Sequence, residues 1–201
     1  VNVLLFNNRI YGLTKGQYSP TSEQGKVTKS TPFGSPDMPL NPMLFALSAG
    51  ATFIARTFDV DAKGMQEIFK EAAKHKGTSF VEIYQNCNIF NDGTFSAVND
   101  RSLREDRILR LNHGEILTFG KEQKKGIRLR GLKPVLLNLY EGVNKKELLI
   151  QDQYSEDSTL ANLLSGFDYP EFSVLIGILR QFEHNPYEEK NEQQIKTQIE
   201  K

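Results

Sequence analysis

Short apolar runs punctuate the first half of the chain. Residues 1–6 form one such run without a charged member and predict a buried strand, and residues 52–58 and 80–84 predict two more. Between the last two runs, apolar positions over 65–73 recur at the spacing of an amphipathic helix. Strand, helix and strand in this order predict a βαβ unit. We therefore expect an α/β fold built on a parallel sheet.

Local end signals set the bounds of two helices in this half. Pro42 suits a first helical position, which predicts a short helix over 43–48 that ends before Gly50. Asp61 is a suitable N-cap for the amphipathic helix, and basic residues followed by Gly77 close it.

The second half of the chain has a weaker pattern. Charged residues crowd into 100–110 and predict a solvated face, with a protein contact as the alternative. Strands are expected near 115–119 and 134–140, and helices over 159–164 and 172–182. The residues after His184 are polar with few apolar anchors and predict a disordered tail.

Composition excludes several classes of function. The chain has 201 residues, 25 basic and 25 acidic, so it has no net charge, and a basic nucleic-acid-binding face is not expected. No apolar run approaches the ~18 residues of a membrane span. A single cysteine rules out an internal disulfide and suits a reducing cytoplasm.

The most informative segment follows the first strand. Asn7 and Asn8 open a glycine-punctuated loop at the strand's carboxyl end, which is where open α/β sheets bind ligands. An asparagine oxygen suits a hard cation such as Mg²⁺. Lys15 lies between Thr14 and Gly16, so a positive charge and approachable backbone amides can meet an anion. The alternatives are an ordinary turn and an exposed lysine.

Two further features need a context. The segment 18–41 is rich in Ser, Thr, Pro and Gly, and loops of this length are usually functional or disordered. Cys87 follows the third predicted strand, and a lone cysteine is most often a small buried hydrophobe. The three histidines have no metal or catalytic spacing and are interpreted as structural.

These segments resemble one family. Residues 7–42 closely resemble the β subunit of 2-oxoacid:ferredoxin oxidoreductases, most of all the 2-oxoglutarate type, and residues 80–93 and 113–129 agree. The resemblance covers roughly 1–139. It implies a thiamin-diphosphate-binding fold, with the C-terminal half of that parallel-sheet domain followed by a C-terminal extension.

The resemblance also sets the expected domain bounds. Residues 1–98 would be the C-terminal part of the thiamin-diphosphate-binding domain, 99–183 the extension, and 184–201 the polar tail. Family members carry a Gly-Asp-Gly element and three more cysteines upstream of the paired asparagines, and this chain has neither. We therefore expect an N-terminally truncated subunit.

The resemblance assigns roles to particular residues. It implies that Mg²⁺ is bound by the side chain of Asn8 and the carbonyl of Ile10, and that Lys15 has a catalytic role in holding the substrate carboxylate. Cys87 would be the fourth ligand of a 4Fe–4S cluster, which this fragment alone cannot assemble because it lacks the other three thiolates. The residues expected to bind thiamin diphosphate are Asn8, Ile10, Tyr11, Gly12, Leu13, Thr14, Lys15 and Gln17.

The implied reaction is the reversible oxidative decarboxylation of 2-oxoglutarate to succinyl-CoA. Thiamin diphosphate would act as the electron sink, ferredoxin would accept electrons through the cluster, and coenzyme A would take the acyl group. Activity would need the α subunit. A second substrate carboxylate needs a cation, and the loops offer Arg9, Lys15, Lys26 and Lys29. The alternatives are a pyruvate or broad 2-oxoacid enzyme, a cluster-free thiamin-diphosphate enzyme, and a non-catalytic scaffold subunit.

Overall fold

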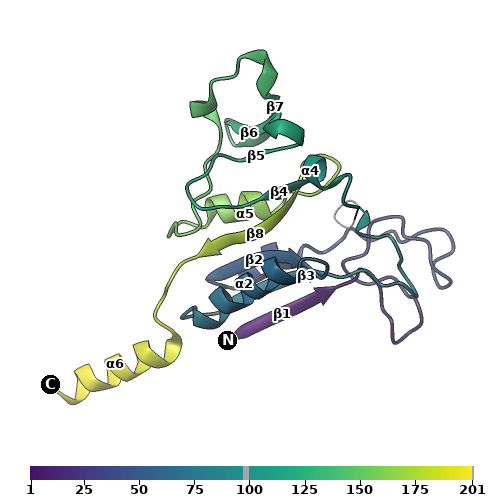
Figure 1. The fold of residues 1–201 in the computed structure, drawn as a ribbon. Helices are drawn as coiled ribbons and strands as arrows, with labels where there is room; N and C mark the ends of the chain where they lie inside the picture. The colour runs from purple at the N-terminus through teal and green to yellow at the C-terminus, as the bar shows by residue number, and fades with distance from the viewer. Residues whose placement is uncertain (97–99, 201) are drawn as a thin grey trace.

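A five-stranded sheet forms the centre of the molecule (Figure 1). The computed structural model describes residues 1–96 and 100–200. The strand order is β1-β3-β2-β8-β4. The strands are β1 (Asn2–Asn7), β2 (Phe53–Phe58), β3 (Ser79–Tyr84), β4 (Ile108–Arg110) and β8 (Val174–Gln181).

The predicted βαβ unit is present. Strands β2 and β3 are parallel neighbours, and α2 (Ala62–Lys74) connects them. Asp61 caps α2, because its Oδ1 accepts from the backbone N–H of Gly64 at 3.0 Å. Strand β1 pairs in parallel with β3 on the other side. The sequence-based prediction of an α/β fold with parallel strands is therefore confirmed.

Strand β8 corrects one prediction. The sequence predicted a helix over 172–182, but Val174–Gln181 is a strand that runs antiparallel to β2 and parallel to β4. Its apolar run fits a buried helix and a buried strand equally well, and pairing on both sides decides in favour of the strand. The sheet is therefore mixed.

Helices cover both faces of the sheet. Helix α2 packs Ile68 and Ala72 onto Phe53 and Val81 on one face. On the other face lie α1 (Pro42–Ser48) and α5 (Thr159–Ser165), both of which were predicted. Asn41 joins these two helices: its Oδ1 caps α1, and its Nδ2 donates to the carbonyl of Ser165 at 2.6 Å.

Strand β1 is an edge strand, whereas the sequence predicted a buried one. Among residues 1–96 and 100–200 it pairs only with β3, so it has a neighbouring strand on one flank. Val3, Leu4 and Phe6 are accordingly 42%, 44% and 51% exposed.

A smaller antiparallel sheet packs against the α1–α5 side of the core through buried residues such as Ile127. It contains β5 (Thr118–Phe119), β6 (Lys125–Arg130) and β7 (Lys133–Asn138), near the two strands predicted in this region. The short helical segments around it are α4 (Arg104–Arg107), η1 (Lys121–Gln123), η2 (Leu139–Glu141) and η3 (Lys145–Glu147).

The charged segment 100–110 is more than a solvated face. Arg104 lies over the ring of Phe58 at 5.3 Å, and Arg107 lies over the ring of Tyr169 at 4.6 Å. These arginines pack their planar groups on aromatic rings that belong to the main sheet and to the loop before β8.

The polar tail forms helix α6 (Tyr187–Ile199), which projects from the body (Figure 1), whereas the sequence predicted disorder. Helix α6 has no buried residue, so its order comes from helix-forming Glu, Gln and Lys. The expected domain boundary between residues 98 and 99 lies outside the described residues.

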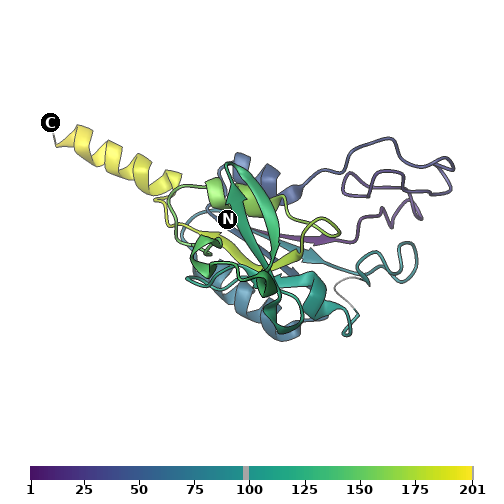
Figure 2. The same cartoon turned by 90° about the horizontal axis from the view of Figure 1, so that it is seen from above.

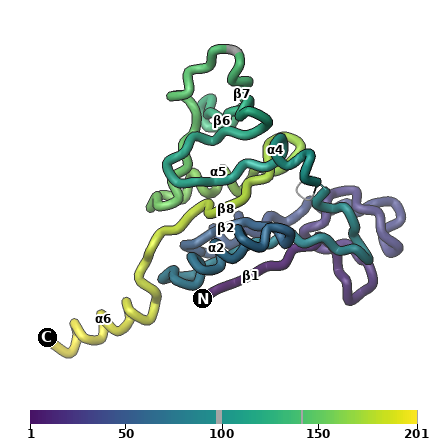
Figure 3. The backbone as a smooth tube through the Cα atoms, viewed as in Figure 1, coloured from purple at the N-terminus to yellow at the C-terminus, as the bar shows by residue number. Residues whose placement is uncertain are grey.

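The loops that follow β1 and β3 extend together beyond the carboxyl ends of these strands. The backbone tube in Figure 3 and the view from above in Figure 2 both show them side by side at one end of the sheet. The long segment 18–41 is held by its own hydrogen bonds, such as Gly25 N–H to the Ser35 carbonyl at 2.8 Å. This end of the sheet contains the asparagine turn and the loop with Cys87.

Candidate functional site

Asn7 fastens the end of β1 to the neighbouring elements. Its side chain is buried, and its Nδ2 donates to Oε1 of Glu82 at 2.8 Å. Its Oδ1 accepts from the Thr21 hydroxyl at 2.7 Å and from the Arg9 backbone N–H at 3.1 Å. With both its oxygen and its nitrogen engaged, Asn7 is a structural anchor.

Asn8 is half-buried and keeps its amide oxygen within its own loop. Its Oδ1 accepts from the Ile10 backbone N–H at 3.2 Å, which forms an Asx-type turn. An amide oxygen has two lone pairs, so this contact leaves one for another partner. Arg9 lies between Asn8 and Ile10 and has a φ of 54°, a left-handed value that is uncommon outside glycine. Two oxygen donors suited to a hard cation, one from a side chain and one from a backbone, thus belong to one tight turn.

The loop from Tyr11 to Gln17 is a closed turn at the surface. The Tyr11 N–H donates to the Gln17 carbonyl at 2.8 Å, and the Gly16 N–H donates back to the Tyr11 carbonyl at 3.0 Å. Lys15 is exposed at this turn and has a φ of 60°. The other predicted cofactor-binding residues here, Gly12, Leu13 and Thr14, are exposed as well.

Gly16 explains how the turn closes. Its φ is 103°, and a Cβ there would lie 3.3 Å from the ring of Phe90 in the loop after β3. Glycine allows both the backbone conformation and the close approach of the two loops.

A buried ion pair lies beneath the turn. Nε of Arg56 donates to Oε2 of Glu82 at 2.9 Å, and these side chains are only 3% and 1% exposed. Nη1 of Arg56 is buried without a hydrogen-bond partner among the described residues. Because Glu82 also accepts from Asn7, the pair connects strands β1, β2 and β3.

Arg9 extends this network to the loop before β8. Its Nη2 donates to Oδ2 of Asp168 at 3.0 Å, and its guanidinium lies 4.9 Å from the ring centre of Phe95. A cavity of about 450 Å³ lies among these groups, bounded also by Met38–Pro42. Lys15 is not among the residues that line it.

The charge states of the network follow from its surroundings. Burial raises the pKa of the Tyr84 phenol well above its usual value, so the phenol stays neutral. Burial acts to lower the pKa of Arg56, but the neighbouring Tyr84 and Glu82 outweigh it and raise that pKa. Burial also acts to lower the pKa of Arg9, but Tyr84 and Asp168 outweigh it and raise that pKa. Both guanidiniums therefore remain charged.

Cys87 lies half-buried in the loop after β3. Its carbonyl accepts from the backbone N–H of Asn91 at 2.9 Å, so the two residues close a small turn. No group of three or more His, Cys, Asp or Glu side chains is arranged to hold a metal ion anywhere in 1–96 or 100–200. The Cys87 thiol is thus not part of such a group within these residues.

Sequence reasoning missed the partners that shape the site. Glu82, Thr21, Asn91 and Asp168 contact the asparagine loop, and none was selected. One signal was available: Arg56 and Glu82 are opposite charges inside two apolar runs that were predicted to be neighbouring parallel strands. Such a pattern predicts a buried ion pair.

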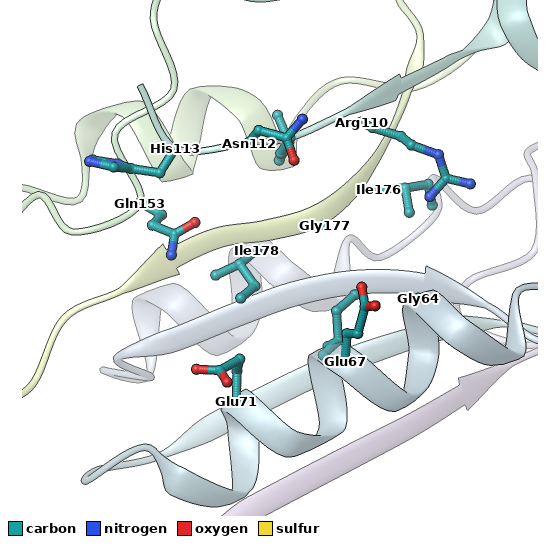
Figure 4. A pocket seen from close by; sticks show the side chains of 12 residues that line it. Gly64, Glu67, Glu71, Arg110, Asn112, His113, Gln153, Ile176, Gly177 and Ile178 are labelled. Atoms are coloured by element: carbon teal, nitrogen blue, oxygen red, sulfur yellow. The ribbon is translucent and has the colours of Figure 1, made fainter. Parts of the chain in front are cut away.

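A second cavity, of about 380 Å³, lies between α2 and β8 (Figure 4). Glu67 and Glu71 border it from α2, and Arg110, His113 and Gln153 border it from the opposite side. It contains none of the residues that the sequence predicted to bind a cofactor, a metal or the substrate.

Residues 1–83 match the family model described as "Thiamine pyrophosphate enzyme, C-terminal TPP binding domain". The chain is 42% identical over 196 residues, or 97% of its length and 52% of the relative's, to the 2-oxoglutarate oxidoreductase subunit KorB of Mycobacterium tuberculosis. It is 45% identical over 92 residues, covering 46% of the chain and 30% of the relative, to the 2-oxoacid:ferredoxin oxidoreductase subunit beta of Saccharolobus solfataricus.

The fold has a solved counterpart. A 2-oxoglutarate:ferredoxin oxidoreductase from Magnetococcus marinus, with 2-oxoglutarate, coenzyme A and succinyl-CoA bound, superimposes with a TM-score of 0.66 and 26% identity. The superposition covers 98% of this chain and 52% of that one. The chain thus spans about half the length of the Mycobacterium tuberculosis subunit and of the Magnetococcus marinus chain. Within the described residues, no helix is both long and apolar enough to cross a membrane.

Proposed function

The chain is related by sequence and by fold to the β subunits of 2-oxoacid:ferredoxin oxidoreductases, and from this premise we propose that it acts in the oxidative decarboxylation of 2-oxoglutarate. The products would be CO₂ and succinyl-CoA, ferredoxin would accept the electrons, and an α subunit would complete the enzyme. The observation that carries the proposal is the 42% identity to a 2-oxoglutarate oxidoreductase subunit over 97% of the chain.

The asparagine turn is the proposed magnesium and thiamin diphosphate site. Its donors are of the right kind: Asn8 offers a neutral amide oxygen with a lone pair to spare, and the backbone of Ile10 offers a carbonyl. Asn7, by contrast, has its side chain fully engaged in structure. The match of residues 1–83 to the thiamine pyrophosphate domain supports the same assignment.

Thiamin diphosphate, when bound, supplies the electron sink on which a 2-oxoacid can lose CO₂. The residues expected to hold it besides Asn8 and Ile10 are those of the following turn: Tyr11, Gly12, Leu13, Thr14, Lys15 and Gln17. Lys15 is exposed on that turn, so its ammonium can reach an anion outside the chain. We assign it to the substrate carboxylate.

The four cations weighed for the substrate's second carboxylate differ in their surroundings. Arg9 is paired with Asp168, and Lys26 donates to Glu23 at 2.9 Å and to Asn91. Lys15 and Lys29 are exposed. Recruiting Arg9 or Lys26 would break existing contacts, and Lys15 is assigned to the first carboxylate, so Lys29 is the better candidate on this chain.

Cys87 is the proposed ligand of a 4Fe–4S cluster. A cluster takes four thiolates and this chain has one cysteine, so the remaining ligands must lie outside these residues. The half-buried position of Cys87, in the loop beside the asparagine turn, is compatible with electron transfer between the two sites.

The decisive experiment is Asn8→Ala in the complete enzyme, with α and β subunits assembled. Removing a side-chain ligand should weaken Mg²⁺–thiamin diphosphate binding by at least about tenfold, measured by titration calorimetry. Asn2→Ala, an exposed asparagine at the other end of β1, is the matched control and should bind normally. Equal affinity in the two variants would contradict the metal-site assignment.

The substrate assignment needs its own measurement. The kcat/KM for 2-oxoglutarate should exceed that for pyruvate, with either ferredoxin or methyl viologen as acceptor. A pyruvate value equal or higher would replace 2-oxoglutarate by a broader 2-oxoacid specificity. An assembled enzyme without turnover on any 2-oxoacid would support the non-catalytic alternative.

A further inference from the structure

Asn91 contacts three loops at once. It is 5% exposed and lies in the turn that begins at Cys87. Its Nδ2 donates to the backbone carbonyls of Asn8 at 2.9 Å and Arg9 at 3.2 Å. Its Oδ1 accepts from Nζ of Lys26 at 2.5 Å in the long loop.

Both the nitrogen and the oxygen of the side-chain amide take part in these contacts. An asparagine Nδ2 has two hydrogens, and each of the two carbonyls takes one. Its backbone is engaged as well, since its N–H donates to the Cys87 carbonyl at 2.9 Å. A buried amide with all its groups satisfied fixes its neighbours in place, because moving any of them leaves a buried polar group unpaired.

The two carbonyls lie on either side of a strained position. Arg9 has a φ of 54°, which needs support from its surroundings. Holding the Asn8 and Arg9 carbonyls fixes both peptide planes around this residue. Those planes determine how Asn8 and Ile10 are presented. The hydroxyl of Ser22, in the long segment 18–41, also donates to the Arg9 carbonyl and helps to fix the peptide plane that follows Arg9.

We propose that Asn91 is a positioning residue that couples the asparagine turn to the Cys87 turn. The structural coupling stands on the contacts above. Its consequence for cofactors rests on the proposed function, in which Asn8 holds Mg²⁺ and Cys87 holds a cluster. A displacement at either turn is transmitted to the other through one side chain and one peptide N–H.

The test is Asn91→Asp, which keeps the shape and the acceptor for Lys26 but removes both donors to the carbonyls. Asn88→Asp is the matched control, because Asn88 is exposed, lies next to Cys87 in sequence and accepts from Asn86 in its own turn. Lys26→Met is a second variant, which removes the third contact and leaves the carbonyl bonds intact.

Two readouts on the 201-residue chain judge the coupling without any cofactor. Asn91→Asp should speed amide hydrogen exchange in residues 8–17 by about tenfold and Cys87 alkylation by about threefold, because both turns lose one support. Lys26→Met should give a smaller change in both, and Asn88→Asp should change neither. A variant that loosens only one turn, or an Asn88 change of the same size, would overturn the coupling.

Two readouts on the assembled enzyme judge its consequence. Asn91→Asp should raise the Kd for Mg²⁺–thiamin diphosphate about tenfold and shift the reduced-cluster EPR signal, and Asn88→Asp should do neither. Normal affinity and signal in Asn91→Asp would refute the cofactor role. If the wild-type enzyme binds neither group, the proposed function fails, while exchange and alkylation still decide the coupling.

Discussion

The buried pair Arg56–Glu82 should dominate the stability of the sheet end at which the candidate site lies. Both side chains are at most 3% exposed, and their Nε–Oε2 distance is 2.9 Å. Replacing one partner leaves the other charge buried without compensation. We expect Arg56→Met and Glu82→Leu each to lower the free energy of unfolding by about 3–5 kcal/mol.

The double variant should cost much less than the sum of the two single ones. Arg56→Met with Glu82→Leu removes both charges and also the unpartnered Nη1, and leaves only the Asn7 Nδ2 without its acceptor. A lost buried acceptor costs about 1–3 kcal/mol. The measured coupling between the two positions should therefore be at least about 3 kcal/mol.

Urea unfolding of the 201-residue chain, followed by circular dichroism, gives the three values. Lys74→Met is the control, because Lys74 and Glu71 form a pair of similar length, 2.8 Å, with side chains 71% and 39% exposed. That variant should lose no more than about 0.5 kcal/mol. Additive single effects, or an Arg56→Met cost below about 1 kcal/mol, would refute the reasoning.

Three further results are expected. Burial lowers the pKa of His75, so the unfolded state binds more protons below about pH 6.5. The free energy of unfolding should therefore fall as the pH drops through this range, by at most about 1.4 kcal/mol per pH unit. In urea titrations His75→Gln should flatten this pH dependence, whereas His184→Gln, at an exposed histidine, should not. Gly16→Ala should destabilise the chain by about 1–2 kcal/mol because of its positive φ and the nearby Phe90 ring, whereas Gly12→Ala, with open space, should not; equal melting curves for the two would contradict this. Cys87→Ala in the assembled enzyme should abolish the reduced-cluster EPR signal and lower iron content, and a full cluster in this variant would make Cys87 a structural residue.

Local signals in the sequence predicted the first half of the fold well. Helices α1 and α2 begin at Pro42 and Ala62, directly after the N-caps Asn41 and Asp61. The signals that predicted them, Pro42 and Asp61, act within a few residues. Strand β8 was mispredicted because its identity depends on pairing with β2, more than 100 residues away, which an apolar run does not reveal.

The candidate site likewise has a part that local sequence signals predicted and a part that depends on long-range contacts. The asparagine turn is contiguous, so its motif predicted Asn8 and Lys15 together. The network that supports it joins Asn7 to Glu82 and Arg9 to Asp168, contacts that span 75 and 159 residues. The sequence alone does not indicate how far along the chain such hydrogen-bond partners lie. Only the opposite charges inside β2 and β3 indicate that a buried network exists.

Strand β1 is one of the two edge strands of the sheet, and the asparagine turn follows directly at its carboxyl end. Strand β8 already occupies the far side of β2, whereas the outer flank of β1 has no partner among the described residues. A strand added there in parallel would have its register set by the pleat of Val3, Leu4 and Phe6. Its carboxyl end would then lie beside the asparagine turn, so polar residues that follow it would lie near the proposed magnesium site. An extension of the sheet at this edge would in that way also bring new oxygen donors to the proposed magnesium site.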